Sequence, residues 1–467
     1  MNVSPARQAA FETVRRVFED DAYADRAFRA AAEGIDPRER ALAQRLAYGT
    51  VQRVRTLDHG IEELGGRPVA KLDAPVLAAL RLGAYQLAYS EVAVHAAVNE
   101  SVELVRGAGV ERAVKFTNAV LRRLTLGLRE LVEALPEEAP AQSALRHSYP
   151  DWVAEVWWRD LGADQARELM RAQNEPPERA VRLNARRRGP VGGERDPTIP
   201  GAVTVERIED CDLAAGFVWP QSRGSQLAGL AVGAQPGERV LDLCAAPGGK
   251  ATQLAESAEE VVAVEKHAGR AHELEANCKL LGATNVRVVT ADALALPDDL
   301  GEFDRVLVDA PCSGLGVLAA RPDLRWRGKP LPDLQRDLLR VAVERVRPGG
   351  AVVYSVCTIN ADENEAVVDA SGLQPDSLGE EWPQFAHPGR PEFLLTLPHR
   401  DHTSGFFIAR LRSSAARAGT TGSGPSRSSR RSTRRTSRAS ASRSRCCCAR
   451  SAASSTSTSA TATSFRP

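Results

Sequence analysis

Apolar residues recur at helical spacing through the first part of the chain. Ala10, Val14 and Val17 lie on one face of a first helix. Further helices are predicted over residues 37–51, 73–88, 93–106 and 111–124. Short glycine-containing connections separate them, which is typical of a compact helical bundle. We therefore expect an all-helical domain over residues 1–130 and a helical connector over residues 131–177.

From residue 238 the pattern changes to alternating strands and helices. Short buried runs predict strands over residues 240–243, 261–265, 286–290, 305–309, 351–356 and 406–411. Helices are predicted over residues 250–257, 267–281 and 334–346. This alternation predicts an α/β fold, with a doubly wound, Rossmann-like parallel sheet over residues 238–412 that binds ligands at the carboxyl ends of its strands. Residues 178–237 are mixed in character and are expected to form a small α+β subdomain.

The composition changes at residue 413. Hydrophobic residues make up 43% of the 467 residues and the formal net charge is +1, yet residues 413–467 hold eleven Arg and no Lys, Asp or Glu. This tail is rich in Ser, Arg, Thr and Ala, so it cannot bury a core and is predicted to be disordered. Two interpretations stay open: a basic RNA-binding arm, or the product of a cloning or reading-frame artefact.

The cysteine and apolar patterns bear on location. No apolar run approaches the roughly 18 residues of a membrane span, and the first residues lack the apolar segment of a signal peptide. The eight Cys include no CxxC pair and no zinc-site spacing. We expect a cytoplasmic monomer whose cysteines are reduced and which binds neither metal nor membrane.

The strongest local motif is a loop of small residues between a predicted strand and a predicted helix. After Asp242 and Leu243 it reads Cys244, Ala245, Ala246, Pro247, Gly248, Gly249 and Lys250. Small side chains let the backbone approach a ligand, and a helix amino end offers free N–H groups. The motif is neither a dinucleotide fingerprint nor a P-loop. We expect a ligand loop; the alternative is a tight turn without a ligand.

Two acids follow the next strands. Glu265 ends its strand at about the distance at which dinucleotide folds place an acid against ribose hydroxyls. Asp292 follows the third strand and could accept a hydrogen bond from an adenine amine. The alternatives are a solvated surface acid for Glu265 and an N-cap for Asp292.

Two thiols are expected at the same edge of the sheet. Asp309, Pro311 and Cys312 follow the fourth predicted strand, and Cys357 follows the fifth. A lone buried Cys is usually a small hydrophobic residue, but a pair beside a ligand loop and an acid points to chemistry.

Such a pair suits methylation at carbon 5 of a pyrimidine. A thiolate that adds to carbon 6 makes carbon 5 nucleophilic, and a base must afterwards remove the carbon 5 proton. Asp309 could hydrogen-bond the ring and its exocyclic amine. The residues alone do not decide which of Cys312 and Cys357 attacks.

Several motifs together resemble a known family. They are residues 95–100, 116–123, 242–250, 309–316, 321–326, 354–358 and 405–407. The first two are similar to NusB-like domains, and the combination resembles the RsmB (Sun/Fmu) family of 16S ribosomal RNA cytosine-5 methyltransferases. The resemblance covers residues 5–412, leaving only the tail without a counterpart.

The resemblance implies roles for the residues of these motifs. Contacts to S-adenosylmethionine would come from Cys244–Lys250, Glu265, Asp292 and Asp309. Cys357 would be the nucleophile and Cys312 would assist product release. Glu265 stands where Asp is more usual, and Val356 and Thr358 stand where Thr and Ser are commoner. Neither departure removes a reacting atom.

The implied partner is 16S ribosomal RNA, whose phosphates need local cations. Candidate cations are Lys115, Arg122, Arg123, Arg182, Arg186–Arg188, Arg321, Arg325 and Arg327. Trp326 is either a base-stacking residue or a core residue. Two other functions remain: methylation of another RNA such as transfer RNA, and a non-catalytic NusB-like RNA-binding or antitermination factor. The intact thiols and ligand loop argue against the second.

Overall fold

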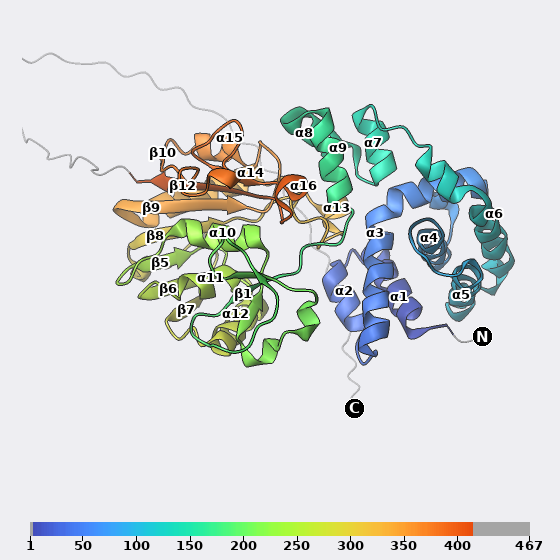
Figure 1. Cartoon of the computed structure of the whole chain (residues 1–467), viewed down its shortest axis with the longest axis horizontal. Coiled ribbons are helices and arrows are strands. Elements are labelled where there is room, and N and C mark those ends of the chain that lie inside the picture. The colour runs from blue at the N-terminus through green and yellow to red at the C-terminus, as the bar shows by residue number, and fades with distance from the viewer. Residues whose placement is uncertain (1–2, 414–467) are drawn as a thin grey trace, which may run out of the picture. The chain divides into compact units, whose positions relative to one another are not determined.

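The computed structural model describes residues 3–413, so the predicted tail beyond Ser413 lies outside the described residues. The chain begins with a series of helices (Figure 1). They are α1 (Pro5–Glu19), α2 (Ala24–Ala31), α3 (Pro37–Gly65), α4 (Ala74–Tyr89), α5 (Val94–Gly107), α6 (Val114–Glu133), α7 (Pro140–His147), α8 (Asp151–Leu161) and α9 (Ala163–Ala172). Helices α1 to α6 enclose a shared apolar core, as the period of their apolar residues predicts.

Helix α3 is much longer than its predicted counterpart. The prediction over residues 37–51 was wrong at its end, because the helix runs on to Gly65 and closes with Gly66 in the left-handed region at φ 70°. Gly49 and Gly60 lie inside it, where an added Cβ would meet Tyr85 and Leu128. These glycines therefore allow neighbouring helices to pack closely.

A small antiparallel sheet follows the helices. Its strands are β1 (Ala180–Leu183), β2 (Glu194–Arg195), β3 (Ala202–Thr204) and β4 (Val218–Pro220), in the order β2-β3-β1-β4. Helix α10 (Arg223–Val232) comes next and packs against α11 (Gly249–Leu254) and β12 (Phe406–Arg412) of the following part.

The main sheet has the predicted doubly wound, Rossmann-like order. Its strands are β5 (Arg239–Asp242), β6 (Glu260–Glu265), β7 (Val286–Thr290), β8 (Phe303–Asp309), β9 (Val346–Val356), β10 (Gln374–Pro375), β11 (Leu394–Thr396) and β12 (Phe406–Arg412). The order is β10-β12-β9-β8-β5-β6-β7, with β11 also paired to β12. Strands β5 to β9 are parallel to their neighbours, whereas β12 is antiparallel to β9.

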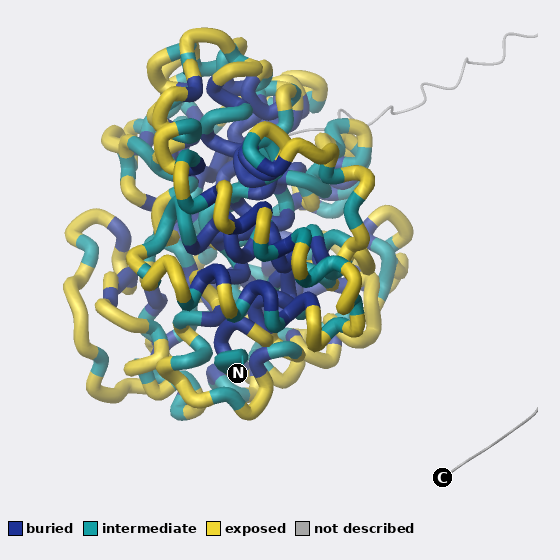
Figure 2. Tube along the Cα trace, turned by 90° about the vertical axis from the view of Figure 1, so that its right-hand side faces the viewer, coloured by how far each residue is buried: buried dark blue, intermediate teal, exposed yellow. Residues whose placement is uncertain are grey.

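Helices accompany this sheet. They are α11 (Gly249–Leu254), α12 (Ala268–Leu281), α13 (Leu324–Arg327), α14 (Pro332–Arg345), α15 (Glu365–Asp369) and α16 (Pro398–Asp401). Figure 2 shows the buried residues gathered inside the molecule, with exposed residues at the outer turns. Trp157 of α8 belongs to the same apolar cluster as the sheet, and its indole N–H donates to the carbonyl of Ile359 at 3.1 Å. The connector helices thus pack on the sheet.

The strand order fixes where a ligand site is expected. The chain moves outward from β5 to β7 and then returns to the other side of β5 with β8. Loops at the carboxyl ends of β5 and β8 therefore diverge at a switch point, where doubly wound folds bind ligands. Among residues 3–413, no helix is long and apolar enough to span a membrane, and no group of acidic, His and Cys side chains could hold a metal ion.

Candidate active site

The loop of small residues connects β5 to α11 at the switch point. Gly248 has φ 110°, a backbone conformation that residues with a side chain rarely adopt. A Cβ added here would lie 2.6 Å from the side chain of Leu274. The loop therefore requires glycine here both for its turn and for its packing on α12.

Asp242 ends β5 with its side chain buried. Its Oδ1 accepts a hydrogen bond from the Cys244 N–H at 3.3 Å, while Oδ2 has no hydrogen-bond partner among the described residues. Burial, followed by the negative charge of Asp309, raises the pKa of Asp242 to about 7. A buried oxygen without a donor beside this loop fits a ligand that supplies one. Burial also raises the pKa of Cys244 well above its usual range, so that thiol stays protonated.

An ion pair joins the two sides of the switch point. Lys250, the second residue of α11, places Nζ 2.8 Å from Oδ2 of Asp309 at the end of β8. The other oxygen of Asp309 accepts from the Ser355 hydroxyl at 2.7 Å, and the Lys250 ammonium lies 5.1 Å from the centre of the Phe406 ring. Both groups of the pair are thus held in place by neighbouring strands.

The two predicted acids lie at the carboxyl ends of β6 and β7, with the backbone N–H of Ala291 bonded to the Glu265 carbonyl. Glu265 accepts from the His267 N–H at 2.8 Å. Asp292 accepts from the Leu294 N–H at 3.0 Å and pairs with Lys266 at 2.8 Å, and this pairing lowers its pKa. The acids therefore order their own loops. Their contact with a cofactor stays a prediction.

The two predicted thiols meet. The sulfurs of Cys312 and Cys357 are 3.5 Å apart, although the residues are 45 positions apart in the chain. Cys312 follows β8 and Cys357 follows β9, which are parallel neighbours. Cys312 and Cys357 are both residues of intermediate burial.

The surroundings make the two thiols different. The hydrogen bond shared with Cys312, assisted by the positive charge of Lys250, lowers the pKa of Cys357 against the opposing effects of burial and Asp309. The same hydrogen bond and burial raise the pKa of Cys312, and the charge of Glu363 adds to this effect. Cys357 is therefore the thiol that ionises first.

A close backbone contact locks the two thiol loops together. The Gly316 N–H donates to the Cys357 carbonyl at 3.0 Å, and the Gly405 N–H donates to the Gly316 carbonyl at 2.8 Å. An added Cβ on Gly316 would lie only 2.0 Å from the Gly405 carbonyl oxygen. A cavity of about 690 Å³, lined in part by Gly316, Val317 and Ser404, lies against this contact.

Several predicted RNA contacts are placed elsewhere. Arg182 is buried and pairs with Glu256, and Arg325 is fully buried among backbone carbonyls, so neither guanidinium faces solvent. Their prediction as phosphate ligands does not fit this arrangement, because burial removes them from a passing backbone. Lys115, Arg122 and Arg186–Arg188 are exposed and remain candidates.

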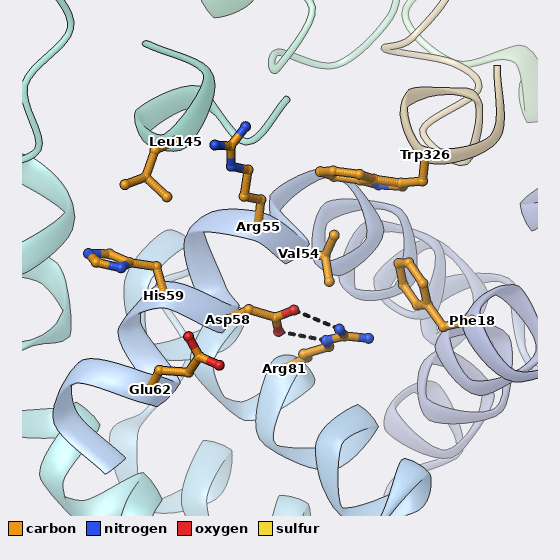
Figure 3. A pocket seen from close by; sticks show the side chains of 9 residues that line it. All are labelled: Phe18, Val54, Arg55, Asp58, His59, Glu62, Arg81, Leu145 and Trp326. Atoms are coloured by element: carbon orange, nitrogen blue, oxygen red, sulfur yellow. Dashed lines mark hydrogen bonds and ion pairs between the residues drawn. The ribbon is translucent and has the colours of Figure 1, made fainter. Parts of the chain in front are cut away.

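Trp326 lies apart from the thiols. Its indole N–H donates to the Val51 carbonyl at 2.8 Å, and its ring lines a hollow of about 480 Å³ on the helical part of the chain. Figure 3 shows side chains that line this hollow, among them Asp58 and Arg81, which form an ion pair. None of its lining residues belongs to the loop of small residues or to the thiol pair.

Two side chains of the site had no predicted role, namely Ser355 and Phe406. Ser355 lies two positions before Cys357, and residues two apart in a strand share a face. That spacing was available in the sequence. The contact of Phe406 with Lys250 depends on the antiparallel return of β12, which no local pattern indicates.

Comparisons with known proteins agree with this geometry. Residues 230–412 match the family model described as 16S rRNA methyltransferase RsmB/F, and residues 4–125 match the NusB family. Ribosomal RNA small subunit methyltransferase B of Vibrio cholerae is 30% identical over 436 residues, covering 88% of this chain and 97% of the relative. The Mycobacterium tuberculosis protein Rv1407 is 37% identical over 453 residues, covering 88% and 97%. The chain belongs to the RsmB/F family of 16S rRNA methyltransferases.

Solved structures have the same fold as this RsmB/F chain. The crystal structure of PH0851 has a TM-score of 0.73 at 24% identity, covering 88% of this chain and 99% of that one. The structure of NSun6 from Pyrococcus horikoshii with SFG has a TM-score of 0.52 at 22% identity, covering 57% and 99%. The expected NusB-like helical domain and Rossmann-like methyltransferase domain are thereby confirmed. Family membership makes the chain an S-adenosylmethionine-dependent rRNA methyltransferase.

Proposed function

We propose that this chain methylates carbon 5 of a cytosine in 16S ribosomal RNA through a covalent bond between Cys357 and the base. The observation that supports this best is the pair of sulfurs 3.5 Å apart at the ends of β8 and β9, beside the Lys250–Asp309 ion pair. Carbon 5 chemistry needs an attacking thiolate and a later proton acceptor. A pair of unlike thiols meets both needs.

Cys357 is suited to the attack. Its lowered pKa increases the thiolate fraction near neutral pH. The thiolate adds to carbon 6, so an S–C6 bond forms and the electron pair of the C5=C6 double bond becomes available at carbon 5. S-adenosylmethionine supplies, when bound, the electrophilic methyl group that carbon 5 takes up. The target base must leave its stack to reach the sulfur.

Cys312 is suited to the release. While Cys357 is a thiolate, the hydrogen bond between the sulfurs keeps Cys312 protonated. Once Cys357 is bonded to carbon 6, its hydrogen bond and charge no longer raise the pKa of Cys312, so Cys312 gives up its proton to solvent more easily than before. Cys312 then takes the proton from carbon 5, the double bond re-forms, and the S–C6 bond breaks to return Cys357 as a thiolate.

The loop of small residues and the acids fit the proposed cofactor. The small residues of Cys244–Lys250 let a ligand come close to the backbone. Oδ2 of Asp242, which has no partner among the described residues, can accept a hydrogen bond from that ligand. Glu265 and Asp292 end the next two strands of the same edge, where ribose hydroxyls and adenine would be held. Asp309 keeps lone pairs free for the exocyclic amine of cytosine.

Labelling decides between this proposal and its alternatives. The full chain is incubated with methyl-labelled S-adenosylmethionine and unmodified 16S RNA or transfer RNA, and the label is mapped by mass spectrometry. We expect 5-methylcytosine at one position of 16S RNA. Labelled transfer RNA alone would favour the second substrate. Binding of 16S RNA without any label would favour a non-catalytic NusB-like factor.

A further inference from the structure

A buried carboxylate, that of Glu363, is hydrogen-bonded to the residues that follow the two thiols. Glu363 belongs to the turn that follows β9, and its side chain is completely buried. It is not used in the steps derived above. A carboxylate so far from water requires several hydrogen-bond donors to remain charged.

Glu363 collects its donors from three segments of the chain. Oε1 accepts from the Ser313 N–H, the Leu331 N–H and the Gln335 amide, each at 3.0 Å. Oε2 accepts from the Ser313 hydroxyl, from the Thr358 hydroxyl at 3.4 Å and from the Asn360 amide at 3.3 Å. Every partner is a neutral group, so the charge of the carboxylate is shared among hydrogen bonds.

Two of these donors are the residues that directly follow the thiols in the chain. Ser313 follows Cys312 and Thr358 follows Cys357, and their hydroxyls are 2.7 Å apart. Leu331 lies at the far end of the long loop that begins at Cys312. One carboxylate therefore closes that loop at its base and ties it to the segment that follows the second thiol.

We propose that Glu363 is a positioning residue that sets the separation of Cys312 and Cys357 and keeps their roles distinct. This inference rests on the proposed function of the thiols. Two loops from different strands hold a fixed geometry only if something joins them, and small displacements of reacting groups cost rate steeply. The negative charge also acts on Cys312, whose pKa it raises, and so favours ionisation of Cys357 first.

The test begins without RNA or cofactor. The full chain is treated with iodoacetamide at a series of pH values, and the labelled Cys312 and Cys357 peptides are quantified. In the unchanged protein Cys357 is labelled faster, by about tenfold for each pKa unit between the thiols. Glu363→Gln removes the negative charge. It also replaces one accepting oxygen with an NH₂ group, which faces groups that are themselves donors. We expect that preference to be lost and kcat for RNA methylation to fall about 10²-fold, with KM for S-adenosylmethionine unchanged.

Asp362→Asn is the matched control, because Asp362 is the adjacent exposed acid and, among residues 3–413, forms an ion pair only with Arg159. It should keep both the preference and kcat. If Glu363→Gln lacks a cooperative melting transition, Gln335→Met is used instead, since it removes one donor and retains the carboxylate. An unchanged preference and kcat in the folded variant would overturn the positioning role. Faster labelling of Cys312 in the unchanged protein would instead contradict the proposed nucleophile.

Discussion

Among single residues, Lys250 acts on the thiols through its positive charge. Its ammonium pairs with Asp309 at 2.8 Å and lowers the pKa of Cys357, second in effect among the favourable causes to the hydrogen bond from Cys312. Thiolate is the reactive form, so reactivity rises as pH passes upward through the pKa of Cys357. A lowered pKa places that rise below the pH expected for a free thiol of pKa about 8.5.

Lys250→Met should move this rise to higher pH. The measurement is the alkylation rate of Cys357 between pH 6 and pH 10, with sulfur reactivity read without cofactor. Lys279→Met, on the exposed face of α12, is the control and should leave the profile where it is. Identical pH profiles for Lys250→Met and the unchanged protein would show that Lys250 does not lower the pKa of Cys357.

At the level of elements, the thiol loops depend on one tight crossing. Gly316→Ala would place a Cβ 2.0 Å from the Gly405 carbonyl oxygen, and a backbone atom cannot yield as a flexible side chain does. We expect methylation to fall at least about 10²-fold because the Cys312 loop must shift. Cofactor affinity should change little, since the loop after β5 is separate. A methylation assay measures the loss of activity, and calorimetric titration with S-adenosylmethionine measures the cofactor affinity.

Gly269→Ala provides the matched control for that variant. Gly269 lies in α12, where an added Cβ meets nothing within 4 Å and alanine favours the helix. It should leave methylation unchanged and raise thermal stability slightly. Equal activity of both alanine variants would show that the crossing is not needed.

The elements also show how far local patterns reach. Strands β5 to β9 and β12, and the proximity of Cys312 to Cys357, follow from strand–helix alternation, because the carboxyl ends of parallel strands share an edge. The short strands β10 and β11 were not predicted. The end of α3 was missed although the apolar pattern continues at helical spacing through Val54, Leu57 and Ile61, which are buried against neighbouring helices, so the sequence did contain this boundary. The hydrogen bonds of Glu363 come from three distant segments, so no spacing in the sequence indicates them.

At the scale of the whole chain, the buried guanidinium of Arg325 is one of the groups that join the helical domain to the methyltransferase domain. Arg325 is fully buried in the loop that begins at Cys312 and lies 4.1 Å from the centre of the Tyr149 ring. It donates to the Asn174 side chain at 2.7 Å, and to carbonyls of Gln173 at 2.7 Å and Gln52 at 3.2 Å. The helical domain therefore supports the loop that carries Cys312.

Arg325→Met should destabilise the protein, because it leaves buried carbonyls without donors. We expect a loss on the order of 3–5 kcal/mol in the free energy of unfolding. Denaturant unfolding of the full chain measures it. Arg340→Met is the control, as Arg340 is an exposed residue of α14 whose one ion pair within the described part of the chain is with Asp337. Equal stability of the two variants would mean that the buried guanidinium does not join the domains.

Trapping of the covalent adduct distinguishes Cys357, proposed to form the bond to RNA, from Cys312, proposed to release it. Full-length Cys312→Ser, Cys357→Ser and the double variant are incubated with S-adenosylmethionine and unmodified 16S RNA, then run on a denaturing gel. Cys312→Ser should accumulate a protein–RNA adduct that contains a methylated base, because attack proceeds and proton removal fails. Cys357→Ser and the double variant should form none. An adduct in Cys357→Ser but not in Cys312→Ser would contradict the account and make Cys312 the nucleophile.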